Sequence, residues 1–168
     1  GLFIDATGRQ AVIKTYDRFV GRHQDFAEVA YDGKKLILRS ALSSEVYMLA
    51  HRLNRISERQ RLFRDFTLNS LGRALREVLT CFPVYRTYID SSGISDGDRH
   101  VVLQAVAQAK RRNPTLDTAL FDFIRDTMLA ADWSTKDSAG YYERMLFVGR
   151  CQQITSPAMA KGIEDTAF

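Results

Sequence analysis

Two short segments of this 168-residue chain carry side chains whose types and spacing could do chemistry. Residues 85–88 read Tyr-Arg-Thr-Tyr, and Lys161, Glu164 and Asp165 fall within five positions beside a glycine. Aromatic rings stack on the apolar faces of sugars, while a guanidinium offers a planar fork of donors. Adjacent carboxylates near an ammonium group predict a polar site in which charged neighbours set the ionisation state.

Each segment also has a purely structural interpretation. Residues 85–88 could form an edge strand whose Tyr and Arg side chains pack on the body of the protein. Residues 152–166 are rich in small and hydrogen-bonding side chains, and they could form a solvated tail with an incidental ion pair. The residue types alone leave both alternatives open.

The bulk composition is that of an ordinary globular domain. The chain has 24 Lys and Arg against 20 Asp and Glu, a net charge of +4, and 45% hydrophobic residues. No apolar run reaches the roughly 18 residues that a membrane helix needs, so no membrane partner is expected. The densest basic stretch, 52–64, is interrupted by Glu58 and by apolar residues, which argues against a nucleic-acid partner.

Cysteine and histidine do not form a recognisable reactive or metal-binding pattern. Cys81 and Cys151 stand among apolar neighbours and are predicted to be small buried residues. His23, His51 and His100 are scattered, and no glycine-rich phosphate loop or nucleophile motif is present. We therefore expect neither a metal nor a cofactor. The lack of a signal-like start makes a reducing, cytoplasmic location the default expectation.

Hydrophobic periodicity predicts a mostly all-α, bundle-like fold. The expected helices cover 9–20, 25–59 (as one helix or two, with a kink at Gly33), 67–81, 96–112, 115–131 and 138–153. Residues 82–89 are β-branched and aromatic, which predicts an extended crossing. Residues 154–168 contain Pro157 and Gly162 without amphipathic spacing, so they are also expected to be extended.

Several helix ends and one helix face follow from residue type. The candidate N-caps are Thr7, either Asp65 or Thr67, Ser95 and Thr115, and Gly21 is a candidate left-handed stop. In the helix over 9–20, the apolar residues are expected to lie on one face; these are Val12, Ile13, Tyr16 and Phe19.

Six runs of sequence closely resemble the maltooligosyltrehalose synthase family. Two are CFPVYRTYI at 81–89 and the run at 152–168, which contains SPAMAKGIEDTAF at 156–168. A third is LILRSALSSE at 36–45; the remaining runs are 1–5, 53–56 and 64–68. The runs are spread from one end of the chain to the other, so the resemblance extends over essentially the whole chain, and together they are long enough to be specific.

The resemblance implies a fold and an activity for a longer parent enzyme. The family's members are α-amylase-clan enzymes with a (β/α)8 barrel and large insertions. They convert the reducing-end α-1,4 linkage of a maltooligosaccharide into an α,α-1,1 linkage, giving maltooligosyltrehalose. The clan uses a nucleophilic carboxylate and an acid/base carboxylate in a retaining arrangement. No segment of this chain matches either of those two motifs.

The residues of this chain that the resemblance marks are few. Asp165 matches best the third carboxylate of the clan, which holds sugar hydroxyls and stabilises the transition state. The candidate contacts to the maltooligosaccharide substrate are Tyr85, Arg86, Gln153, Lys161 and Glu164. Glu164 stands where many clan members have His, so its contact with the sugar does not follow from the clan pattern.

The organisation implied by the resemblance is that of an excised piece. Residues 1–153 would be a helical insertion domain, and residues 154–168 an extended segment of the parent barrel. The piece is expected to be inactive by itself, and its bare barrel-facing surface could drive association in a crystal. The competing interpretation is a stand-alone α-helical module that binds a protein partner.

Overall fold

The computed structural model describes residues 5, 7–21, 25–129 and 139–166, and in these residues it is all-α. The elements are α1 (Arg9–Val20), α2 (Phe26–Arg39), α3 (Ser43–Glu58), α4 (Leu68–Thr80), α5 (Asp96–Arg112), α6 (Thr118–Leu129), α7 (Ala139–Met159) and the π-helix η2 (Ala160–Glu164). The described residues contain no β-strand, only an isolated bridge between Asp90 and Gly93. The predicted all-α class is confirmed.

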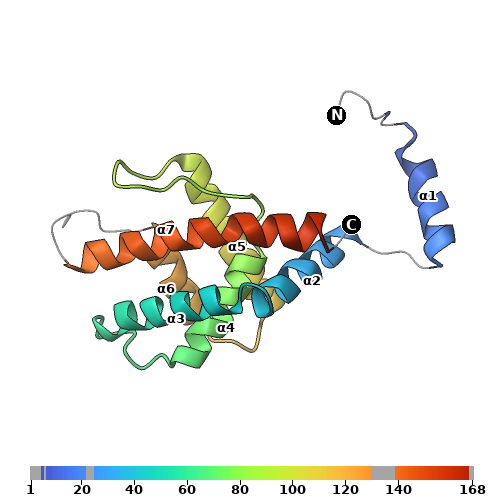
Figure 1. The fold of residues 1–168 in the computed structure, drawn as a ribbon. Coiled ribbons are helices and arrows are strands. Elements are labelled where there is room, and N and C mark those ends of the chain that lie inside the picture. The colour runs from blue at the N-terminus through green and yellow to red at the C-terminus, as the bar shows by residue number, and fades with distance from the viewer. Residues whose placement is uncertain (1–4, 6, 22–24, 130–138, 167–168) are drawn as a thin grey trace.

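Helix α4 lies at the centre of the bundle. It contacts α2, α3, α5, α6 and α7 (Figure 1). Its apolar residues recur at helical spacing and are fully or almost fully buried; they are Leu71, Ala74, Leu75, Val78 and Leu79. Helix α7 crosses the body beside α3, so the chain's last helix closes the core that the earlier helices begin.

The caps predicted at Thr67 and Ser95 are confirmed, whereas those predicted at Thr7 and Thr115 are wrong. Gly8 precedes α1 without a side-chain capping bond, and α6 begins only at Thr118, where the Asp117 side chain accepts the Ala119 amide at 2.9 Å. The Thr67 hydroxyl accepts the Ser70 amide at 3.1 Å, and the Ser95 hydroxyl accepts the Asp98 amide at 3.0 Å. Gly21 ends α1 with φ of 75°, a left-handed conformation that suits glycine.

The periodic stretch over 25–59 forms two helices, and the break lies at residues 40–42 instead of Gly33. Gly33 is buried inside α2, where it does not interrupt the helix. A single helical glycine costs only about 1 kcal/mol relative to alanine, which tertiary packing readily offsets.

Helix α1 leaves its apolar residues exposed. No residue of α1 is buried, and the exposed fractions of Val12 and Phe19 are 69% and 89%. Figure 1 shows α1 lying away from the other helices. The described residues therefore do not cover the apolar side of this helix, since periodicity reports amphipathicity and does not identify the element that covers an apolar face.

The expected extended conformation of residues 154–168 is also wrong for the part that the structure describes. Helix α7 continues through Pro157 to Met159, and the backbone then makes one π-helical turn. Ile154, Ala158 and Met159 are buried, so packing against the body outweighs the local cost of the proline. Residues 167–168 lie outside the described residues.

A close approach of backbones holds η2 against α2. A Cβ atom placed on Gly162 would lie 2.6 Å from both Cα and Cγ of Lys34. Real side chains do not approach so closely, so only glycine fits at this position. The glycine that suggested an extended tail is therefore required by helix packing.

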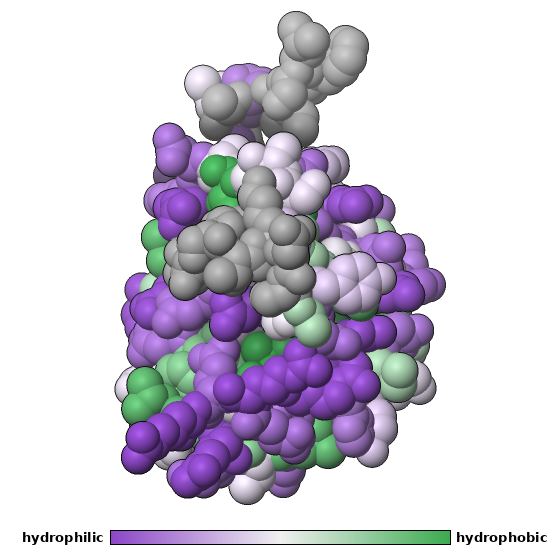
Figure 2. Space-filling view, turned by 90° about the vertical axis from the view of Figure 1, so that its left-hand side faces the viewer, coloured by the Kyte–Doolittle hydropathy of each residue, from purple (hydrophilic) through white to green (hydrophobic). Residues whose placement is uncertain are grey.

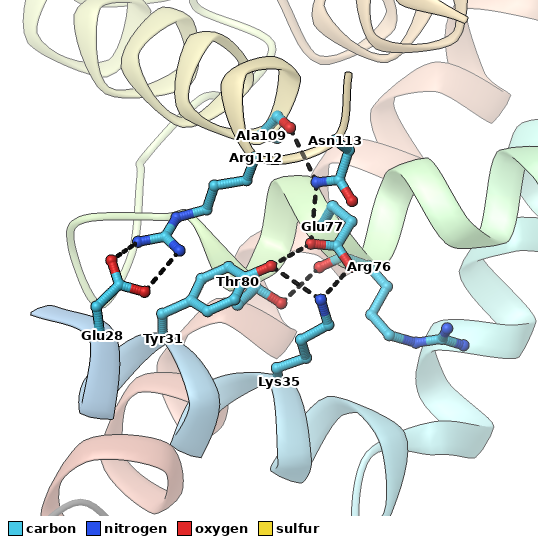
Figure 3. A network of polar contacts seen from close by, with 9 residues as sticks. All are labelled: Glu28, Tyr31, Lys35, Arg76, Glu77, Thr80, Ala109, Arg112 and Asn113. Carbon is cyan, nitrogen blue, oxygen red and sulfur yellow. Dashed lines mark hydrogen bonds and ion pairs between the residues drawn. The ribbon is translucent and has the colours of Figure 1, made fainter. Parts of the chain in front are cut away.

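A network of polar side chains joins α2, α4 and α5 (Figure 3). The Tyr31 hydroxyl donates to one Glu77 oxygen at 2.5 Å, and the Lys35 ammonium lies 2.8 Å from the other. The Asn113 amide donates to Glu77 at 3.2 Å. Arg112 stacks over the Tyr31 ring, with its Cζ atom 4.0 Å from the ring centroid.

The network determines the charge state of Glu77. Burial opposes ionisation, but hydrogen bonds from Lys35, Tyr31 and Asn113 together hold the pKa of Glu77 below its usual value of 4.5. Glu77 is 6% exposed, so its carboxylate is a buried charge that its neighbours compensate. Removing that charge would leave the Lys35 ammonium without its partner.

One face of the molecule is mainly hydrophilic. Figure 2 shows the face that lies at the left of Figure 1, and its visible hydrophobic areas are small and separated by polar residues. None of the described helices is long and apolar enough to cross a membrane.

We expect Glu77→Gln to lower the free energy of unfolding by about 2 kcal/mol at pH 7, because buried charge-assisted hydrogen bonds are lost. The lowered pKa means that this stabilisation is complete well above pH 4.5 and disappears as the pH falls through the folded-state pKa. Urea unfolding at pH 7 measures the loss of stability, and the same experiment at pH 3 measures how that loss depends on pH. Asp32→Asn, an exposed change on α2, is the control. A deficit that is equal at both pH values would contradict the role of Glu77.

Gly162→Ala should destabilise the fold by about 1–3 kcal/mol, because the added methyl group overlaps Lys34. Gly149→Ala on α7 is the matched control: nothing lies within 4 Å of its Cβ position. The control should gain up to about 1 kcal/mol from helix propensity. Thermal unfolding of the two variants tests this, and equal midpoints would disprove the close packing.

Candidate functional site

The predicted extended crossing at 82–89 is non-helical, and its side chains alternate between exposed and buried over residues 86–89. Phe82, Thr87 and Ile89 are buried, with exposed fractions of 2%, 1% and 2%. Tyr85, Arg86 and Tyr88 are exposed. The segment therefore anchors itself through one set of side chains and presents the other set to the surface.

Gln152 on α7 fastens the crossing. Its side-chain oxygen accepts the Ile89 amide at 2.6 Å and the Thr87 hydroxyl at 3.1 Å. Its side-chain nitrogen donates to the Ile89 carbonyl at 3.1 Å. This buried side chain replaces the hydrogen bonds that a neighbouring strand would supply. In the sequence, Gln152 belongs to the hydrogen-bonding segment 152–166, but nothing there distinguishes it from the neighbouring Gln153.

Lys34 on α2 holds the start of the crossing. Its ammonium donates to the Phe82 carbonyl at 2.8 Å, and the residue is 7% exposed. Burial lowers the pKa of the Lys34 ammonium. The nearby Cys81 thiol has its pKa raised to about 11 by burial, so it is protonated and unreactive near neutral pH.

The structure brings together two of the predicted site residues, one from the middle of the chain and one from near its C-terminus. The Tyr85 hydroxyl donates a hydrogen bond to the Glu164 carboxylate, which lies at the end of η2. Both side chains are exposed. The crossing and the C-terminal segment therefore form one surface, which we call the Tyr85–Glu164 surface.

Lys161 and Asp165 lie on the same short segment as Glu164. Both are exposed. The Asp165 amide donates to the Ala160 carbonyl at 3.2 Å, and the Lys161 carbonyl accepts the Thr166 hydroxyl at 2.6 Å. These backbone contacts fix the turn that carries both side chains. The described residues provide no ion-pair partner for either charge, which leaves both available to a ligand.

Arg86 and Gln153 are placed differently. The Arg86 guanidinium lies over the ring of Tyr88, with Cζ 5.6 Å from the centroid. Gln153 accepts a hydrogen bond from Arg150 at 2.9 Å and lines a separate groove of about 500 Å3 between α3 and α7. No described hydrogen bond links Gln153 to the Tyr85–Glu164 surface.

In chemical terms, the Tyr85–Glu164 surface offers a phenol, two carboxylates and an ammonium group in an open setting. Such groups suit hydrogen bonds to hydroxyl-rich ligands. The residues that the structure describes contain no group of three or more His, Cys, Asp or Glu side chains that could hold a metal ion.

The fold matches part of a solved enzyme. The match is to the structure of maltooligosyltrehalose synthase from Arthrobacter ramosus, with a TM-score of 0.69 and 24% sequence identity. It covers 98% of this chain and 18% of that enzyme's chain. The chain therefore spans less than a fifth of the length of the protein that it matches. No protein-family model matches the chain, and neither does any curated protein.

At this identity the match shows the fold. It agrees with the family that the sequence motifs resemble, and the stated resemblance is confirmed at the level of structure. The roles of Tyr85, Arg86, Gln153, Lys161, Glu164 and Asp165 are not tested by it.

We expect Gln152→Ala to lower the free energy of unfolding by about 2–4 kcal/mol, because both backbone groups of Ile89 would lose their buried partner. Gln153→Ala is the matched control, since that neighbouring side chain is exposed. Denaturant unfolding compares the two variants, and hydrogen exchange at Ile89 locates the effect. Unchanged exchange at Ile89 in the Gln152 variant would contradict the proposed fastening.

Proposed function

We propose that this chain is a helical part of an enzyme that isomerises the reducing-end α-1,4 linkage of maltooligosaccharides to α,α-1,1. The observation that carries the proposal is the structural likeness over 98% of the chain to part of maltooligosyltrehalose synthase. The sequence motifs at 81–89 and 156–168 point to the same family. The contact between Tyr85 and Glu164 joins these two motifs in space.

In this proposal, the Tyr85–Glu164 surface contacts the sugar at the reducing end. The Lys161 ammonium donates to sugar hydroxyls, and Glu164, oriented by Tyr85, accepts from them. Asp165 supplies the carboxylate that holds hydroxyls more tightly as positive charge develops on the sugar ring. Arg86 and Gln153 belong to a wider substrate surface.

Isomerisation places a particular demand on such a surface. The released glucose must stay bound and reorient in the site. It must then attack the glycosyl-enzyme through its own anomeric hydroxyl before water does. Holding one free glucose through several hydroxyl contacts makes that attack effectively intramolecular. The Tyr85–Glu164 surface is open in this chain, so the proposal requires the rest of the enzyme to cover it and exclude water.

The bond-breaking groups are assigned to parts of the enzyme outside residues 1–168. The nucleophile and the acid/base carboxylate belong to the barrel, so the chain alone should not convert maltopentaose. We propose that residues 154–168 pass from the helical part to that barrel and that the enzyme acts in the cytoplasm. Continuation of the reading frame beyond both ends of the chain would support this, and a frame confined to these residues would contradict it.

A stand-alone protein-interaction module is the second candidate. The exposed apolar face of α1 favours it, since Val12 and Phe19 are open to a partner. An interaction module has no use for the grouped charges of Lys161, Glu164 and Asp165. Isomerase activity of the complete enzyme, measured with variants of these charged residues, therefore distinguishes the two candidates.

Asp165→Asn in the complete enzyme should lower kcat for maltopentaose isomerisation by at least about 100-fold, because a contact that strengthens in the transition state is weakened. Glu164→Gln should mainly raise KM, by about tenfold, because a hydroxyl contact is weakened in the ground state. The control is Asp65→Asn, an exposed change outside the Tyr85–Glu164 surface. Wild-type kcat in the Asp165 variant would remove that residue from the site.

A further inference from the structure

A groove between α3 and α4 is lined by arginines and contains no acidic side chain. Its volume is about 740 Å3. Arg73 and Arg76, one helical turn apart on α4, line it together, and Ser43, Ser44 and Tyr47 line it from α3. The groove is separate from the Tyr85–Glu164 surface: none of the residues that line it belongs to that surface.

The two arginines have no partner among the described residues. Neither forms an ion pair, and Nε of Arg76 is buried without a hydrogen bond. Figure 3 shows the Arg76 guanidinium pointing away from the neighbouring Glu77 network. A buried donor without an acceptor is costly, and a bound acceptor would remove that cost.

Positive charge is concentrated around the groove. Burial lowers the pKa of Arg76 and the charge of Arg39 lowers it further, while the nearby charge of Glu77 partly offsets both. Arg39 also lacks an ion pair within the part of the chain that the structure describes. None of these guanidinium groups forms an ion pair with a described residue, so an anion in the groove would meet arginines that are free to bind it.

The start of α3 adds to the positive electrostatic potential of the groove. Its N-cap is Leu42, which makes no side-chain capping hydrogen bond. Ser43 and Ser44, in the first turn, line the groove; the Ser43 amide donates to the Ser40 carbonyl at 3.2 Å, and Glu45 of the same turn does not line the groove. Backbone amides at a helix start carry partial positive charge and bind phosphate well.

We propose that this groove binds the phosphate group of a small phosphorylated organic molecule. The guanidinium groups of Arg73 and Arg76 match phosphate oxygens in geometry and charge. The groove is far larger than a bare ion needs, and Tyr47 and Met48, each 60% exposed, supply an apolar wall for an organic body. The inference does not rest on the proposed isomerase function.

Isothermal titration of the 168-residue chain tests the proposal with glucose 6-phosphate, inorganic phosphate and glucose at low ionic strength. Glucose 6-phosphate should bind at least about tenfold more tightly than inorganic phosphate, and glucose should not bind measurably. Added salt should weaken the interaction, because it depends on charge. No binding of glucose 6-phosphate, or equal binding of inorganic phosphate, would overturn the proposal.

Arginine variants locate the site. Arg73→Gln and Arg76→Gln should each weaken binding of glucose 6-phosphate about tenfold, since charge-assisted hydrogen bonds are lost. Arg99→Gln on α5, an exposed arginine without an ion pair among the described residues, is the matched control. Circular dichroism checks that each variant folds, and the exposed Arg73 keeps the test informative if Arg76→Gln unfolds. Unchanged affinity in the Arg73 variant would contradict the site.

Discussion

The packing of Lys34 against Gly162 is the constraint on which the candidate site depends. One residue of α2 meets both segments that carry the predicted site: its backbone touches η2, and its ammonium binds the Phe82 carbonyl at the start of the crossing. The distance between these segments is therefore set by a single helix. Gln152 fixes the far end of the crossing, so Tyr85 reaches Glu164 from a rigid support.

Buried polar groups, more than additional apolar burial, give this bundle its specific arrangement. Lys34, Glu77 and Gln152 are all buried, and each is satisfied by a segment distant in sequence. An apolar core tolerates small shifts of one helix on another, whereas a buried hydrogen bond tolerates very little. The α2, α4 and α5 network and the Gln152 contacts therefore select one packing among several that would bury similar area.

Sequence patterns predicted much of the fold, because helix periodicity, caps and glycine stops depend on residues that are close together in the sequence. The helices, the caps at Thr67 and Ser95 and the stop at Gly21 follow from residue type and spacing. The C-terminal segment did not follow, because Gly162 serves a contact with a residue more than 120 positions earlier. Tyr85 and Glu164 were singled out separately by type and resemblance, but nothing local predicted their contact. Lys34 and Gln152 were missed because a buried lysine or glutamine has no distinguishing sequence pattern.

The π-helical turn at Ala160–Glu164 has a consequence for how the charged residues are presented. A π-turn accommodates one more residue than an α-turn, and each residue in an α-helix advances the side-chain direction by about 100°. The turn therefore changes the direction in which later side chains leave the helix axis, so residues after it are rotated relative to the face that α7 buries. A continuous α-helical register would point Glu164 and Asp165 in other directions from the same axis. The side-chain directions at the chain's end are thus encoded by a single extra residue in the backbone.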